Sequence, residues 1–221
     1  VKNEDKDENS MWGWGSVIEN YLDTEKITVD NHARGGRSSR TFLDEGLWDN
    51  VYEALRPGDY VLIQFGHNDG GSVNTDKARG SLRGSDDETK VHKMEKDGRY
   101  QLIYTYGWYL RKYITDAIEK GATPIVLSHV PRNQWDSDGK IKRNKESYGL
   151  WAKEAAEQAG AYFIDLNEAT ASKLEKMDRE QVNSYFKNDH THTSLKGATL
   201  NAESIVEALR ASSIPLKELL K

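Results

Sequence analysis

An aspartate and a histidine near the C-terminus have the spacing of a catalytic pair. Asp189 and His192 stand three residues apart, just before an apolar-periodic run from Leu195 to Leu209. This position predicts a loop or first helical turn, on which residues three apart can share one side. The carboxylate could then accept the imidazole Nδ1–H and leave Nε2 as a base. Taken alone, the spacing is better explained by an aspartate that caps the helix beside surface histidines.

Two other segments offer the polar groups that acyl transfer needs. The Gly35-Gly36 turn can bring backbone N–H groups close to a ligand. Asn68 follows an apolar strand, and its amide could donate to a developing oxyanion, an interaction worth about 2.7–4 kcal/mol in deletion experiments. Each also has a plain structural explanation, as a turn after a strand, and Asp69 is compatible with local hydrogen bonding.

Together these groups form a hydrolase constellation that lacks a nucleophile. The Gly-x-Ser-x-Gly elbow of α/β-hydrolases does not occur in the sequence, which argues against that family.

Alternating strands and helices must position these residues. Strands are predicted at 27–33, 59–65, 123–129 and 161–165, and helices at 47–55, 106–120, 147–159, 167–177 and from about 193 onward. Such alternation indicates βαβ units and a parallel sheet. Functional sites in these sheets collect at the carboxyl ends of the strands, where the segments Arg34–Arg40, Gly66–Gly71 and His129–Trp135 are expected.

Two polar stretches interrupt this pattern. Ser72–Arg99 and Pro131–Lys145 lack helical or strand periodicity, and both are predicted to be irregular loops that shape substrate binding. Residues 1–10 are polar and acidic and are also predicted to be a loop. An apolar set at helical spacing follows Trp12.

Composition limits the classes of protein. The chain of 221 residues suits a single domain, with 36% hydrophobic and 30% charged residues. It contains no cysteine, so neither disulfides nor thiolate chemistry is available to it. No apolar run approaches transmembrane length, and the net charge of −5 argues against nucleic acid as the main partner.

Three segments resemble the SGNH (GDSL-type) hydrolases. Gly-Gly-Arg-Ser-Ser-Arg-Thr-Phe, Gln-Phe-Gly-His-Asn-Asp-Gly-Gly and Asp-His-Thr-His-Thr-Ser are similar to blocks two, three and five of that family. More narrowly, they resemble the rhamnogalacturonan acetylesterases, as do Trp-Gly-Trp-Gly-Ser at 12–16 and Tyr-Gly-Trp-Tyr-Leu-Arg-Lys-Tyr-Ile at 106–114. The resemblance runs in order along essentially the whole chain.

The resemblance implies a three-layer α/β/α sandwich with a short parallel sheet of flavodoxin-like topology. It implies removal of O-acetyl groups from pectic rhamnogalacturonan, with neither a metal nor another cofactor. By motif position, Gly36 N–H and Asn68 would donate to the oxyanion, His192 would be the base and Asp189 its partner. Secretion or a periplasmic location follows by the same analogy, while the oligomeric state is not indicated.

Arginines and aromatic residues are candidates for binding an acetylated acidic polysaccharide. Arg37 and Arg132 could pair with galacturonate carboxylates, and Trp12 could stack on a sugar ring. Further arginines lie on the same expected loops, at Arg34, Arg40, Arg79 and Arg83. The alternative is that these arginines make ordinary surface ion pairs of little energetic value.

The family's first block, Gly-Asp-Ser, carries the nucleophile and does not occur in the sequence. None of the serines Ser10, Ser16, Ser38 and Ser39 takes its position. We therefore expect an apolar strand upstream of Val1 that ends in this block. In a sheet of order 2-1-3-4-5, that strand would lie between the strands at 27–33 and 59–65.

Two other functions stay open. One is a carbohydrate-binding homologue that kept the cleft and lost its nucleophile, which the presence or absence of Gly-Asp-Ser would distinguish. The other is a metallohydrolase with Asp189, His190, His192 and His67 as ligands. Neighbouring side chains in Asp-His-x-His do not all point one way, which argues against the metal site.

Overall fold

The computed structural model describes residues 10–221, which group into two compact units. One, here called the sheet unit, comprises Gly36–His129 and Asn144–Asp165. The other, the helical unit, comprises the described residues up to Gly35 together with Val130–Arg143 and Leu166–Lys221. Each is described by itself below, and the single domain expected from the sequence stays a prediction. Of the loop expected at the N-terminus, residues 1–9 lie outside the described part.

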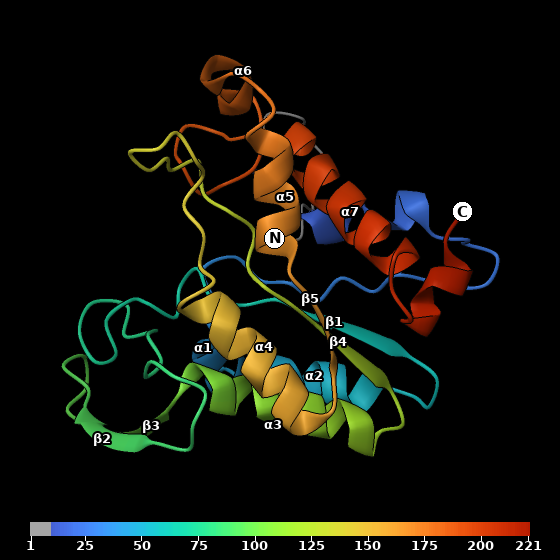
Figure 1. Ribbon diagram of the computed structural model, residues 1–221. Coiled ribbons are helices and arrows are strands. Elements are labelled where there is room, and N and C mark those ends of the chain that lie inside the picture. The colour runs from blue at the N-terminus through green and yellow to red at the C-terminus, as the bar shows by residue number, and fades with distance from the viewer. Residues whose placement is uncertain (1–9) are drawn as a thin grey trace. The chain divides into compact units, whose positions relative to one another are not determined.

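The sheet unit is built on three parallel strands. They are β1 (Tyr60–Ile63), β4 (Thr123–Leu127) and β5 (Tyr162–Ile164), in the order β1-β4-β5 (Figure 1). The register places Leu62 opposite Ile125 and Ile125 opposite Tyr162. Three predicted strands and the parallel sheet are thus confirmed, and their order matches the last three strands of the expected arrangement.

Four helices accompany this sheet: α1 (Ser39–Asp44), α2 (Leu47–Ala54), α3 (Tyr106–Glu119) and α4 (Tyr148–Ala159). Thr105 caps α3 by accepting a hydrogen bond from Trp108 N at 3.1 Å. Gly121, with a φ of +75°, follows the end of the helix. The helices predicted at 47–55, 106–120 and 147–159 are confirmed, whereas α1 begins inside the stretch that we expected to be a turn.

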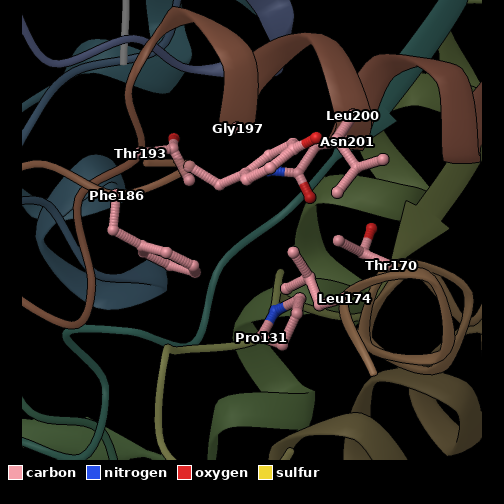
Figure 2. Close-up of a pocket in the computed structure, with 9 residues that line it drawn as sticks. Pro131, Thr170, Leu174, Phe186, Thr193, Gly197, Leu200 and Asn201 are labelled. Carbon is pink, nitrogen blue, oxygen red and sulfur yellow. The ribbon is translucent and has the colours of Figure 1, made fainter. Parts of the chain in front are cut away.

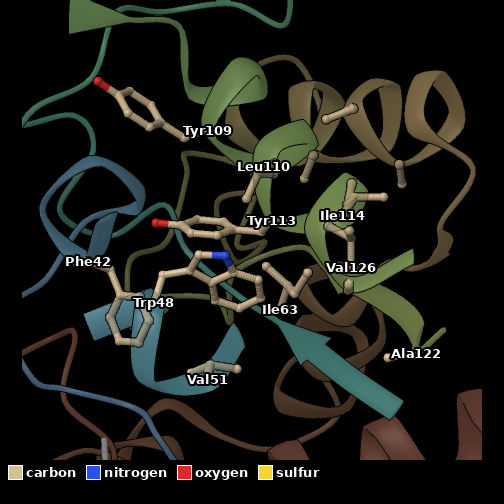
Figure 3. Packing of buried hydrophobic residues seen from close by; sticks show 14 of the residues in the cluster. Phe42, Trp48, Val51, Ile63, Tyr109, Leu110, Tyr113, Ile114, Ala122 and Val126 are labelled. Atoms are coloured by element: carbon tan, nitrogen blue, oxygen red, sulfur yellow. The ribbon is translucent and has the colours of Figure 1, made fainter. Parts of the chain in front are cut away.

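Aromatic side chains fill the core of the sheet unit. Tyr113 packs edge-on against Trp48 and stacks on Phe65, with ring centroids 4.7 and 5.4 Å apart. Figure 3 shows Trp48, Tyr113 and Ile63 close together beneath α3. Because this core lies against β1, it gives a firm support to the loop that leaves the strand and carries Asn68.

An antiparallel hairpin corrects the expectation that Ser72–Arg99 is wholly irregular. It consists of β2 (Thr89–Lys93) and β3 (Tyr100–Tyr104). Val91 and Leu102 lie opposite one another and are both exposed. The strand pattern was missed because the apolar side chains on this face of the hairpin point to solvent instead of a core.

The helical unit contains three α-helices and three short 3₁₀ turns within the described residues. They are η1 (Trp14–Ser16), η2 (Ile18–Tyr21), α5 (Leu166–Leu174), α6 (Arg179–Asn183), α7 (Leu195–Arg210) and η3 (Pro215–Leu219). The predicted last helix is confirmed as α7, with Ser194 as its N-cap residue. The apolar set after Trp12 forms 3₁₀ turns, and α6 was not predicted. No helix within residues 10–221 is both long and apolar enough to cross a membrane.

The strand predicted at 27–33 is not formed. Asn31 Oδ1 accepts the backbone N–H of Ala33 at 3.1 Å, and the His32 ring contacts Asp30 at 2.9 Å. Ile27, Thr28 and Val29 carry strand propensity, but residues 27–34 pair with no strand among residues 10–221 and form neither a turn nor a bend.

Candidate active site

The predicted pair is formed within the helical unit. His192 Nδ1 lies 2.6 Å from Asp189 Oδ2, and both side chains are nearly half exposed. Asp189 Oδ1 accepts the backbone N–H groups of Thr191 and His192, each at 2.7 Å. The carboxylate therefore fixes both the loop and the ring that the loop carries.

The charge state of the pair follows from these contacts. The hydrogen bond from the His192 ring, followed by the backbone N–H of His192, holds the pKa of Asp189 well below its usual range. An ionised carboxylate only accepts hydrogen bonds, so the network assigns the proton of a neutral His192 to Nδ1. The Nε2 atom is then the basic nitrogen, as a general base requires.

Backbone pairing holds the loop on both sides of the histidine. Lys187 N donates to His192 O at 2.8 Å, and Ser194 N donates to Tyr185 O at 3.0 Å. The α7 cap is Ser194, whose side chain accepts from Gly197 N. The capping role considered for Asp189 is therefore wrong, because the helix begins six residues later.

Trp12 and the segment beside Arg132 contact the same loop. Trp12 N donates to Thr193 O at 2.9 Å, and Thr193 Oγ1 donates to Trp12 O at 2.6 Å. Asn133 N donates to His190 O at 2.8 Å. The structure thus brings Trp12 and Asn133, the neighbour of Arg132, to the loop of the Asp189–His192 pair, within one unit.

The predicted oxyanion donors lie together in the sheet unit. Gly36 adopts a φ of +78°, a conformation that favours glycine. Asn68 Nδ2 donates to the backbone carbonyl of Arg37 at 2.9 Å. This bond orients the Asn68 amide and uses one of its two N–H groups, which leaves the other for a ligand. Arg79 Nη1 donates to Gly36 O at 3.1 Å and also holds the turn.

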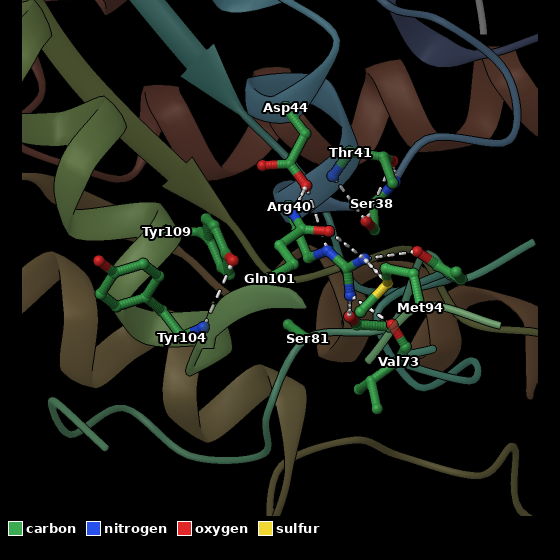
Figure 4. Close-up of polar contacts among 12 residues, drawn as sticks. Ser38, Arg40, Thr41, Asp44, Val73, Ser81, Met94, Gln101, Tyr104 and Tyr109 are labelled. Carbon is green, nitrogen blue, oxygen red and sulfur yellow. Dashed lines mark hydrogen bonds and ion pairs between the residues drawn. The ribbon is translucent and has the colours of Figure 1, made fainter. Parts of the chain in front are cut away.

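The arginines of this unit differ in what they can bind. Arg37 forms an ion pair with Glu45 at 2.8 Å, and both side chains are exposed. Arg40 is only 2% exposed, and its guanidinium donates to the carbonyls of Val73, Ala78 and Gly80 at 2.7–2.8 Å. Figure 4 shows the Arg40 guanidinium and its contact with Val73. The suggestion that Arg40 meets substrate carboxylates is therefore wrong, because its donors hold the backbone of the Ser72–Arg99 stretch, here called the insertion.

Sequence reasoning missed the extent of the contacts made by Asp69. Its local bond to Gly66 N at 3.0 Å agrees with the structural role considered for it. It also accepts from both the backbone and the side chain of Ser39, at 3.0 and 2.5 Å. The only sequence signal was a carboxylate directly after a buried strand, since Ser39 lies thirty residues away.

A small pocket lies in the helical unit. It is lined by Pro131, Thr170, Leu174, Tyr185, Phe186, Thr193, Gly197, Leu200 and Asn201 (Figure 2). Thr193, the neighbour of His192, lines this pocket, whereas Asp189 and His192 do not. Among the described residues, no group of three or more His, Asp or Glu side chains is placed to hold a metal ion.

Comparisons with known proteins bear on the family and the fold. The model of the GDSL-like lipase/acylhydrolase family matches residues 5–200. A rhamnogalacturonan acetylesterase of Emericella nidulans is 35% identical over 96% of this chain and 84% of its own length. A probable rhamnogalacturonan acetylesterase of Bacillus subtilis is 31% identical over 96% of this chain and 89% of its own. The predicted family resemblance is thereby confirmed.

Solved structures agree on the fold. The YxiM protein of Bacillus subtilis aligns with a TM-score of 0.76 and 23% identity, over 95% of this chain and 53% of its own. This chain thus spans about half the length of that structure. An acetylxylan esterase of Geobacillus stearothermophilus aligns with a TM-score of 0.60 and 17% identity, over 89% of this chain and 80% of its own. These likenesses confirm the α/β fold class.

Proposed function

Because this chain belongs to the GDSL-like lipase/acylhydrolase family, we propose that it is a carbohydrate esterase that removes O-acetyl groups from pectic rhamnogalacturonan. The relatives named as rhamnogalacturonan acetylesterases support this substrate. The observation that most directly supports this reaction type is the 2.6 Å contact between Asp189 Oδ2 and His192 Nδ1. That contact leaves Nε2 to act as a base, which an ester hydrolase of the serine type needs.

In the proposed reaction, His192 Nε2 takes the proton of a serine hydroxyl while that oxygen attacks the acetyl carbonyl carbon. The Gly36 N–H and the Asn68 amide stabilise the negative oxygen of the tetrahedral intermediate. When the intermediate collapses, the sugar oxygen leaves and receives the proton from His192. Water then hydrolyses the acetyl-enzyme with the same base and releases acetate.

The proposed nucleophile is the serine of the family's Gly-Asp-Ser block, which the printed sequence does not contain. Ser38 and Ser39 are not proposed for this role. Both are buried at the start of α1, where their hydroxyls bond to Thr41 and Asp69 respectively. Their hydroxyls support the helix start instead.

Arg37, Arg132 and Trp12 are proposed to bind the acidic polysaccharide. Arg37 would exchange its partner Glu45 for a galacturonate carboxylate, at little cost because exposed ion pairs contribute little to stability. Trp12 would offer an aromatic face to a sugar ring.

The test uses the protein expressed from its whole gene. Acetate release is measured from acetylated rhamnogalacturonan, acetylated xylan and an aryl acetate. We expect release from the first and third, and covalent labelling of one serine by a fluorophosphonate probe, read by peptide mass spectrometry. Binding of the polysaccharide without any acetate release would instead favour the inactive carbohydrate-binding homologue. Release from acetylated xylan alone would contradict the proposed substrate.

A further inference from the structure

Asp69 is a buried carboxylate beside the proposed oxyanion donor Asn68. It is 1% exposed and accepts hydrogen bonds from three separate segments of the sheet unit. Ser39 donates its N–H and its hydroxyl, Gly66 its N–H at 3.0 Å, and Ser81 its hydroxyl at 3.4 Å.

These contacts join the two segments that carry the oxyanion donors. Ser39 is three residues beyond Gly36 and begins α1, whereas Gly66 and Asp69 flank Asn68 in the loop after β1. Asn68 itself donates to Arg37 O. Asn68 and Asp69 are adjacent in the chain, and they bond to Arg37 and Ser39 respectively. The spacing between the Gly36 turn and the Asn68 amide therefore depends on the bonds of both residues.

The chemistry of the cluster requires an acceptor at this position. Every group that faces Asp69 in these bonds is an N–H or O–H donor, and an ionised carboxylate can accept from all of them. Burial raises the pKa of Asp69 to about 6, and the bonds from Ser39, Gly66 and Ser81 limit that rise. The carboxylate is therefore mainly ionised at neutral pH, in the form that the four bonds need.

We propose that Asp69 is a positioning residue for the oxyanion hole, which holds the Gly36 turn and the Asn68 amide at the separation that the transition state requires. This inference rests on the oxyanion roles given above to Gly36 and Asn68. Asp69 does not touch the substrate. It acts by keeping the two donors preorganised, so that neither must move as negative charge develops on the carbonyl oxygen.

The experiment compares Asp69→Asn with the parent enzyme in acetate release from an aryl acetate. The amide keeps the size of the carboxyl group, but its NH₂ faces groups that donate. We expect kcat to fall roughly a hundredfold with little change in KM, as small misplacements of catalytic groups produce. Hydrogen exchange of the 36–41 backbone, followed by mass spectrometry, should be faster in the variant.

Asp116→Asn is the matched control. Asp116 is also a buried carboxylate of the sheet unit, but it accepts from Trp48 Nε1 and Lys112 in the helical layer. This control should lose stability and keep its kcat. If Asp69→Asn fails to fold, Ser39→Ala removes one bond to Asp69 and should lower kcat in the same direction by a smaller factor.

The inference would be overturned if Asp69→Asn had the kcat and the hydrogen exchange of the parent, or if only its KM changed. An equal loss of kcat in Asp116→Asn would also overturn it.

Failure of this inference is distinguishable from failure of the proposed function. If the parent releases no acetate, the esterase proposal fails, while the exchange measurement still decides whether Asp69 holds the Gly36 segment.

Discussion

Asp189 uses its two carboxylate oxygens for two separate tasks. Oδ1 accepts two backbone N–H groups of its own loop, and Oδ2 meets the His192 ring. A substitution at Asp189 therefore disturbs both the tautomer of the histidine and the shape of the loop. Removal of the His192 side chain, by contrast, deletes the proposed base and leaves the loop bonds in place.

From this difference we predict that His192→Ala lowers kcat for acetate release about 10⁶-fold, while Asp189→Asn lowers it about 10⁴-fold, as the corresponding changes do in serine proteases. His190→Ala is the control, because we assign no catalytic role to its side chain, and it should keep near-parent activity. Circular dichroism checks that each variant is folded. Near-parent kcat in His192→Ala would show that the base is another residue.

Asn68→Ala is predicted to lower kcat roughly a hundredfold or more, with little effect on KM, because an oxyanion donor acts in the transition state. Asn74→Ala serves as the control, since Asn74 also donates its amide to a backbone carbonyl, that of Lys93. Steady-state kinetics on an aryl acetate measure both constants. A pure rise in KM would assign Asn68 to ground-state substrate positioning instead.

At the scale of elements, the β2–β3 hairpin presents an apolar and aromatic face to solvent. Tyr100 is 73% exposed, and Leu102 and Val91 are exposed on the same face. The sequence suggested that the polar stretch containing β2 shapes polymer binding, and an exposed tyrosine is a suitable surface for a sugar ring.

We accordingly predict that Tyr100→Ala raises KM for acetylated rhamnogalacturonan and leaves the kinetics on an aryl acetate unchanged. Little stability should be lost, because the side chain is mostly in solvent. Tyr162→Ala, at another exposed tyrosine of the same unit, is the control. Equal effects on polymer and small substrate would mean that the hairpin acts on the chemistry and not on binding.

At this scale, the features that could be predicted from the residues themselves are formed by residues close together in the chain. Helices α2, α3 and α4 were found because their apolar residues recur at helical spacing and glycines follow two of them. The Asp189–His192 contact was found because both residues lie in one short loop. The Ser39–Asp69 bonds and the buried contacts of Arg40 could not be found, because their partners are separated by thirty residues or more and share no periodic pattern.

At the scale of the whole molecule, charge should affect how a polymer reaches the site. The chain carries a net charge of −5, and the proposed substrate is itself an anion. Like charges repel over the Debye length, which is about 30 Å at 0.01 M salt and about 8 Å at 0.15 M. The positive side chains Arg37 and Arg132 would act only at short range.

Raising the salt concentration across this range is therefore predicted to increase kcat/KM for acetylated rhamnogalacturonan. A neutral aryl acetate should show no such increase and provides the control, since it is not repelled. If kcat/KM for the polymer instead fell with salt, attraction by the local arginines would outweigh the repulsion from the whole chain.

The buried guanidinium of Arg40 has a consequence for how relatives of this protein can diverge. Its Nη groups donate to the carbonyls of Val73, Ala78 and Gly80, all in the insertion after Asn68, whereas its Nε pairs with Asp44. A shorter insertion would leave the buried guanidinium without these three carbonyl acceptors, which is destabilising. Loss of Arg40 would leave the three carbonyls without their donor. The length of this insertion and the residue at position 40 should therefore change together, so that a relative with a shorter insertion carries a neutral side chain there.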